Sequence, residues 1–280
     1  MKRHAVFVIL LWLYLLSVAQ PGIRPDETLY MYGRVNHWMD SREKLIAELD
    51  QMQQNGVDGY IIELACWGQT WNRQMVHHVG RQYNWLLRQC RKRGLALFVS
   101  VVNDNMGHRK YGDTGPLLED VEDMAHKLVR IVRKGGPRGV YVQPVAETQT
   151  DAGKRLEQYC ILVLSGYVLI YNGEGGFPGT VPSGFQYRAV HPAHISTDVP
   201  ADAVAVSDHG LIIRELAADG TLDGPADSVK LTTWVRRMQE AGVPLIGYYA
   251  FQRREPDTVA ISLLGQIKRG AVKPVLLGNK

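Results

Sequence analysis

Short apolar segments alternate with longer amphipathic segments along most of the chain. Most of the short segments are nearly continuous apolar runs, and such runs are typical of parallel strands that are covered on both faces. This pattern predicts eight strands, at Leu29–Asn36, Gly59–Ala65, Ala96–Asp104, Gly139–Glu147, Val168–Asn172, Phe185–His191, Ala203–Asp208 and Leu245–Phe251.

Amphipathic helices are predicted after several of these strands. Ser41 is a typical N-cap for the first helix, and Gly56 is suited to end it. Pro116 fits the first turn of the third helix. The predicted helices run from Ser41 to Gly56, from Trp71 to Arg93, from Pro116 to Lys134, from Asp151 to Leu164, from Ala226 to Ala241, and from Pro256 to just before Gly270.

The repeated order of strand, helix, glycine and strand indicates βαβ units and a parallel sheet. Right-handed crossovers would curl eight such units into an α/β fold of the (β/α)8 TIM-barrel type, for which 280 residues is a usual length. The segment between Asn172 and Ala203 is rich in Gly, Pro and Ser. We therefore expect the helices after strands 5 and 6 to be short or replaced by loops. A doubly wound open sheet is the alternative, but no glycine-rich phosphate loop follows the first strand.

The first residues of the chain predict an export signal. Two basic residues precede the apolar run Val6–Leu16, and Ser17-Val18-Ala19 supplies the small residues of a cleavage site. The alternative is an uncleaved N-terminal anchor, for which the apolar run is short. We expect a signal peptide at residues 1–19 and a single (β/α)8-barrel domain at residues 20–280. The protein would then be secreted or periplasmic, with no integral membrane span after cleavage.

The composition is that of an ordinary globular protein, with 45% hydrophobic and 21% charged residues. Loss of the two basic signal residues lowers the formal charge from +4 to +2, which argues against a nucleic-acid partner. Of the three cysteines, Cys90 and Cys160 lie in helical patterns, where a buried free thiol is expected, and Cys66 follows a strand. No zinc-type spacing occurs, so neither a metal nor a cofactor is expected.

Polar and aromatic side chains follow every predicted strand, whereas the opposite strand ends are mostly small or apolar. The active site of a (β/α)8 barrel lies at the carboxyl ends of its strands, so this asymmetry predicts a site there. In strand order, the residues at these ends are Arg34, Asn36, His37; Glu63, Cys66, Trp67; Asn103, Asp104, Asn105; Glu147; Asn172, Glu174; His191, His194; Asp208, His209; and Tyr249, Gln252.

The carboxylates among these residues suggest cleavage of sugar bonds. That reaction needs one protonated acid for the leaving oxygen and one carboxylate as nucleophile or base. Glu147 and Asp208 are the first candidates. Glu63 is the third, because a charged residue within an apolar run is rarely buried without a partner. Contacts with the carbohydrate are expected from Arg34, Asn36, Trp67, Asn103, Asn172, His191 and Tyr249.

With a carboxylate ending both the fourth segment, Val140–Glu147, and the seventh, Ala203–Asp208, the sequence resembles the cellulase-type superfamily of retaining (β/α)8 glycoside hydrolases. His191 and the aromatic-rich segment Gly247–Phe251 also resemble that pattern. The resemblance implies that Glu147 is the acid/base and Asp208 the nucleophile. The sequence departs from the family at Ala146, where the family has Asn, and at Asp208, where it has Glu.

Structural roles are the alternatives for these acids. Glu147 is also placed to cap the following helix, and Asp208 to shape the turn before Gly210. Glu63 is also placed to pair with Arg34 on the adjacent strand. Other candidates for the nucleophile are Glu174 and, if the seventh strand is Leu211–Leu216, Glu215.

The first hypothesis is therefore a secreted glycoside hydrolase acting on a poly- or oligosaccharide by a two-carboxylate mechanism. A non-catalytic glycan-binding or surface-assembly protein on the same scaffold is the second. A metal-assisted hydrolase is the third, and its ligands would be His191, His194, Asp208 and His209.

Overall fold

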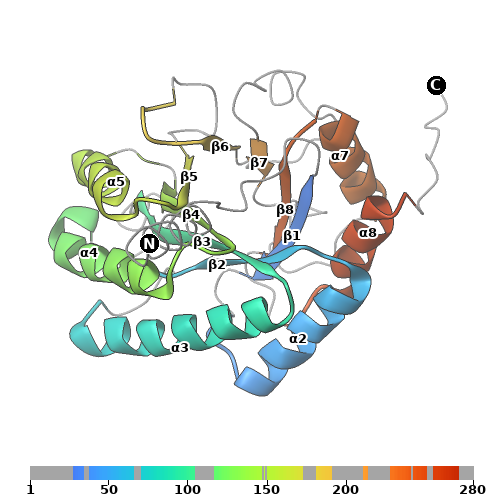
Figure 1. The fold of residues 1–280 in the computed structure, drawn as a ribbon, viewed down its shortest axis with the longest axis horizontal. Helices are drawn as coiled ribbons and strands as arrows, with labels where there is room; N and C mark the ends of the chain where they lie inside the picture. The colour runs from blue at the N-terminus through green and yellow to red at the C-terminus, as the bar shows by residue number, and fades with distance from the viewer. Residues whose placement is uncertain are drawn as a thin grey trace, which may run out of the picture.

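Helices and strands alternate along the chain, and the strands come together in the middle of the molecule in the computed structural model (Figure 1). The structure describes residues 28–34, 38–65, 71–104, 117–146, 148, 150–172, 181–190, 211–213, 228–240, 242–250 and 255–270. The strands are β1 (Leu29–Arg34), β2 (Gly59–Glu63), β3 (Ala96–Asn103), β4 (Val140–Ala146), β5 (Val168–Tyr171), β6 (Tyr187–Val190), β7 (Leu211–Ile213) and β8 (Leu245–Ala250). The helices are α2 (Arg42–Asn55), α3 (Arg73–Lys92), α4 (Leu118–Gly135), α5 (Asp151–Val163), α7 (Ser228–Glu240) and α8 (Thr258–Lys268).

All strand pairings in the described part of the chain are parallel, and the sheet order is β7-β6-β5-β4-β3-β2-β1-β8. Cα atoms of the two outer strands of this order, β7 and β8, come within 8 Å of each other. The sheet is therefore curled into a barrel. The labelled helices surround the strands on the outside in Figure 1. This is the predicted (β/α)8 architecture, and it excludes the doubly wound open sheet.

The strand register sorts side chains into two layers. Residues that are paired in neighbouring strands point to the same face of a sheet, and successive residues of a strand point to opposite faces. Tyr60 of β2 faces outward, because its hydroxyl donates to Glu48 of α2 at 3.2 Å. Ile61 and Glu63 alternate with Tyr60 and therefore face the barrel interior.

Local signals in the sequence set the ends of the helices. The Ser41 side chain accepts from the Lys44 N–H at the start of α2, and Gly56 ends that helix with φ of 77°. The Asp257 carboxylate accepts from the Ala260 N–H at the start of α8. These caps satisfy backbone groups that have no partner inside the helix.

The sequence analysis placed seven of the strands and all six helices correctly, with ends that differ by at most two residues. The seventh strand of the sheet is β7, which falls within the alternative segment Leu211–Leu216, whereas the first choice, Ala203–Asp208, lies outside the described residues. Both segments are short apolar runs, and periodicity does not distinguish them. Between β5 and β6, the described residues 172 and 181–186 form no helix, whereas residues 173–180 and 191–210 are not described, so the expected loops after strands 5 and 6 stay a prediction.

The export signal also lies outside the described residues, and so does Cys66. Within the described ranges, no helix has the length and apolar character needed to cross a bilayer. Cys90 and Cys160 are buried free thiols, as predicted. Burial raises the pKa of the Cys90 thiol to about 12, which keeps it protonated and unreactive at neutral pH.

Glu48 holds α2 to the outer face of the sheet, so its replacement tests this packing. We expect Glu48→Gln to lower the free energy of unfolding by about 3–5 kcal/mol, because it removes the charge of the fully buried carboxylate that binds the Arg34 guanidinium through two hydrogen bonds. Urea denaturation followed by circular dichroism measures the change. Glu43→Gln, at an exposed position of the same helix, is the control and should change stability by less than about 0.5 kcal/mol. Equal stabilities of the two variants would contradict this role.

Candidate active site at the carboxyl ends of the strands

The predicted site residues fall into two groups. Glu63, Arg34, Asn103 and Asn172 are described with their side chains, and Tyr249 is described as a position in β8 that pairs with Gly33 of β1. The other predicted residues lie outside the described part of the chain: Glu147, Asp208, Asn36, Trp67 and His191.

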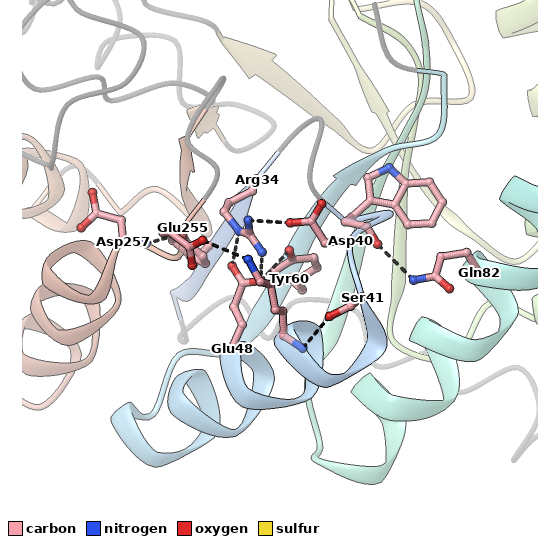
Figure 2. A network of polar contacts seen from close by, with 11 residues as sticks. Arg34, Asp40, Ser41, Glu48, Tyr60, Gln82, Glu255 and Asp257 are labelled. Atoms are coloured by element: carbon pink, nitrogen blue, oxygen red, sulfur yellow. Dashed lines mark hydrogen bonds and ion pairs between the residues drawn. The ribbon is translucent and has the colours of Figure 1, made fainter. Parts of the chain in front are cut away.

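Arg34 lies on the outer face of the sheet, in the network drawn in Figure 2. Its guanidinium donates to both carboxylate oxygens of Glu48, each at 2.7 Å, and forms an ion pair with Asp40 at 3.3 Å. The Arg34 and Glu48 side chains are both fully buried. This bidentate geometry gives Arg34 a structural role between β1 and α2, and we leave it out of the site proposed below.

The alternative pair between Glu63 and Arg34 is not formed. Arg34 is paired with Glu48 on the outer face, whereas Glu63 points into the barrel. This alternative fails because residues on adjacent strands pair only when they face the same side of the sheet. The apolar runs that the sequence analysis used do not reveal which side that is.

Glu63 belongs to a polar row inside the barrel. It is paired in register with Ser100 of β3, which is paired in turn with Gln143 of β4, and all three side chains are fully buried. The Ser100 hydroxyl and the Gln143 carboxamide oxygen have no hydrogen-bond partner among the described residues. Toward the carboxyl ends of the strands, buried apolar residues such as Val102 and Val145 follow this row.

Asn172 follows β5 and ties three strands together. Its side-chain amide donates to the carbonyl oxygen of Ala189 in β6 at 3.0 Å. Its own carbonyl oxygen accepts from the backbone N–H of Thr148, just after β4, also at 3.0 Å. Asn103 is paired in register with Ala146 at the end of β4 and is nearly buried. The carboxyl ends of β3 to β6 therefore form a hydrogen-bonded polar rim.

Asp104, at the end of β3, fixes the start of α5. Its two carboxylate oxygens accept from the Thr150 N–H at 2.7 Å and from the Thr150 hydroxyl at 2.8 Å. The Thr150 hydroxyl caps α5 by accepting from the Gly153 N–H at 3.1 Å. A Cβ at Gly153 would lie 2.4 Å from the Asp104 carboxylate, so the close approach requires glycine here.

Glu157 is a buried carboxyl of α5 beside this rim. Its side chain forms a short hydrogen bond with the Thr148 hydroxyl. Burial raises the pKa of Glu157 to about 7, against the lowering effect of the Thr148 hydrogen bond, while the charge of Asp104 raises it further. Glu157 therefore exchanges a proton near neutral pH, which is unusual for a carboxyl group.

Sequence reasoning missed Thr148, Thr150, Glu157, Ser100 and Gln143. Thr150 carried a usable signal, because Thr directly before a helix is a typical N-cap. Glu157 carried a weaker one: it lies beside Leu156 and Cys160 on the buried side of α5. Ser100 and Gln143 are polar residues inside apolar strand runs, which is the same signal that singled out Glu63.

No group of three or more metal-binding side chains occurs within the described ranges. The histidines of the metal-assisted alternative, His191, His194 and His209, lie outside those ranges. Among the described residues, the rim therefore supplies hydrogen-bonding groups and carboxylates, but no cluster of three metal-binding side chains.

No protein-family model matches the sequence, and no curated protein matches it either. Solved structures share the fold. A structure named glycoside hydrolase aligns over 86% of this chain and 69% of its own length, with a TM-score of 0.58 and 10% identity. The endo-1,4-β-D-mannanase from Thermotoga petrophila RKU-1 aligns over 85% of this chain and 99% of its own, with a TM-score of 0.54 and 10% identity.

The GH5 family lichenase from Caldicellulosiruptor sp. F32 aligns over 85% of this chain and 93% of its own, with a TM-score of 0.53 and 11% identity. Identities this low show the fold alone. That fold is the (β/α)8 barrel.

The pKa of Glu157 makes stability depend on pH. Its carboxyl binds a proton more tightly in the folded protein than in the unfolded chain, so stability falls as pH rises from about 4.5 to about 7. Glu157→Gln removes this pH-dependent contribution to the free energy of unfolding. We expect the wild type to lose about 3 kcal/mol relative to Glu157→Gln between pH 4 and pH 8, measured by urea denaturation. Glu119→Gln, at an exposed position of α4, is the control and should follow the wild type. A constant difference between wild type and Glu157→Gln across this range would refute the buried titration.

Proposed function

We propose that this protein is a secreted glycoside hydrolase that cleaves a poly- or oligosaccharide with two carboxyl groups at the carboxyl ends of the barrel strands. The observation that carries the proposal is the hydrogen-bonded rim at the ends of β3 to β6, in a barrel whose fold is shared with structures named glycoside hydrolase, mannanase and lichenase. Barrel enzymes place their chemistry at this end.

Glu147 is the proposed general acid. It stands between Ala146, the last residue of β4, and Thr148, whose backbone and side chain are both hydrogen-bonded to the rim. A catalytic acid must be held close to its productive position. Flanking residues that are fixed by a strand on one side and by hydrogen bonds on the other would restrict the backbone of Glu147 in this way. Its task is to protonate the leaving glycosidic oxygen.

The second carboxylate is proposed among the residues near β7. Asp208 precedes this strand, whereas Glu215 comes two residues after its last residue, Ile213. Because barrel enzymes use residues at the carboxyl ends of strands, the observed position of β7 favours Glu215. Asp208 remains the alternative, and Glu174 a weaker one. Glu63, the last residue of β2, is the third proposed acid, and its side chain is fully buried.

Sugar binding is proposed for Asn36, Trp67, His191 and Tyr249. Aromatic rings suit the apolar faces of sugars, and amide and imidazole groups suit their hydroxyls. Asn103 and Asn172 act differently in this proposal: they shape the rim on which the substrate rests. Secretion is proposed from the signal-like residues 1–19.

Loss of the proposed acid should abolish turnover while leaving the fold intact. We expect Glu147→Gln to lower kcat by about 100- to 10,000-fold, because proton donation to the leaving group is lost. Reducing-sugar release from β-1,4-mannan and lichenan measures the effect, since the similar structures are named for enzymes of these classes. Glu122→Gln, at a partly exposed position of α4, is the control. Full activity in Glu147→Gln would dismiss Glu147 as the acid, and glycan binding without turnover by the wild type would favour the binding-protein alternative.

The position of β7 also decides between the two candidates for the nucleophile. We expect Glu215→Gln to lower kcat by at least about 1,000-fold and Asp208→Asn to lower it by less than about tenfold, because only the former removes a carboxylate that follows the observed strand. The same sugar-release assay measures both variants. The reverse order would assign the role to Asp208.

A further inference from the structure

Thr148 is the first described residue after β4, and it is held on two sides. Its N–H donates to the Asn172 carbonyl oxygen at 3.0 Å, and its hydroxyl oxygen lies 3.2 Å from that same oxygen. On the other side, the hydroxyl shares a short hydrogen bond with Glu157. Thr148 is 6% exposed and Glu157 4%, so water does not compete for these bonds.

The number of hydrogen bonds among the Glu157 carboxyl, the Thr148 hydroxyl and the Asn172 carbonyl depends on whether Glu157 is protonated. A threonine hydroxyl has a single proton to donate, and here two acceptors lie within its reach, Glu157 and the Asn172 carbonyl. When Glu157 is ionised, the hydroxyl can donate to only one of them. When Glu157 is protonated, its carboxyl donates to the hydroxyl oxygen, and the hydroxyl proton is free to bind the Asn172 carbonyl. The protonated form therefore makes one more hydrogen bond.

The groups around Glu157 make this proton available near neutral pH. Asp104, from the end of β3, and Lys154, on α5 itself, act on Glu157 with opposite charges. Cys160 of α5 and Tyr171 of β5 also face it, and both are neutral at this pH. Burial dominates over these influences and raises the pKa of Glu157 to about 7.

We infer that Thr148 and Glu157 are positioning residues that hold the end of β4, and that the proton on Glu157 tightens this hold. The inference rests on the proposed function for its catalytic consequence, because the adjacent Glu147 is the proposed acid. Neither residue is required to touch the substrate. They fix the direction in which the chain leaves β4, through β5 on one side and α5 on the other.

Hydrogen–deuterium exchange tests whether Thr148 and Glu157 fix the end of β4, and it needs no assay of activity. In Thr148→Val, which keeps the shape and loses the hydroxyl, amide exchange of the peptide spanning residues 144–150 should rise several-fold at pH 6 and at pH 8. Thr148→Ser should preserve wild-type exchange. Glu157→Gln carries a permanent donor, so the wild type should match it at pH 6 and exchange faster than it at pH 8. Thr233→Val, in α7, is the control and should leave this peptide unchanged.

Kinetics test the catalytic consequence. We expect Thr148→Val to lower kcat by about 10- to 100-fold with KM changed less than about twofold, because a small misplacement of the acid slows chemistry more than binding. Thr148→Ser should restore kcat. The pH profile of kcat should lose an ionisation near 7 in Glu157→Gln.

The outcomes separate this inference from the proposed function. Unchanged exchange in Thr148→Val overturns the inference. Unchanged kcat in Thr148→Val, with an active wild type, overturns it too and leaves the hydrolase proposal standing. Faster exchange in Thr148→Val, in a protein that cleaves no glycan, supports the hold on β4 and refutes the hydrolase proposal alone.

Discussion

Parallel, in-register pairing of the strands is the constraint on which the rest of this structure depends. Because paired residues share a face, the register decides for every strand residue whether it meets a helix or the barrel interior. A shift of one residue would bring Glu63 against α2 and send Tyr60 inward. Gly33 shows how tight the pairing is: a Cβ there would lie 2.2 Å from the carbonyl oxygen of Ile61 on the neighbouring strand.

Buried polar groups are costly unless they are hydrogen-bonded, and they find partners on the outer face of the sheet and at the carboxyl ends of the strands. On the outer face, Arg34 meets Glu48. A second outer cluster joins Asp257, whose N–H donates to the Tyr32 hydroxyl at 2.8 Å and whose carboxylate accepts from Tyr248 at 3.2 Å. Both clusters fasten a helix to the sheet. At the carboxyl ends of the strands, Asp104 fastens the loop that leads into α5.

The positions of most strands and helices were predictable because the signals are local. Caps such as Ser41 and Asp257 and the period of apolar residues depend only on nearby sequence. The orientation of Arg34 was not predictable, because strands covered on both faces lack the alternation that would mark an inside and an outside. Its partner Glu48 lies on the next helix, where a glutamate is usually solvated.

The same limitation applies to the candidate site. Sequence reasoning found that polar residues gather at the strand ends, but it could not divide them between those that build the rim and those proposed to act on substrate. Asp104 and Asn172 both accept or donate hydrogen bonds within the protein, so their polarity is already used. Recognising this requires the contacts between β3, β4 and β5, which are distant in sequence and become visible only when the barrel is assembled.

The carboxyl groups that build the rim also have an electrostatic consequence for the proposed mechanism. A general acid at neutral pH needs a raised pKa, and nearby negative charge is one way to raise it. Asp104, after β3, and Glu157, on α5, each form a hydrogen bond with a threonine that follows β4, and these threonines lie one and three residues after Glu147. Ionisation of these groups favours the protonated form of any carboxyl close to them. Groups that build the rim can therefore serve the reaction through the field they create, without contacting the sugar.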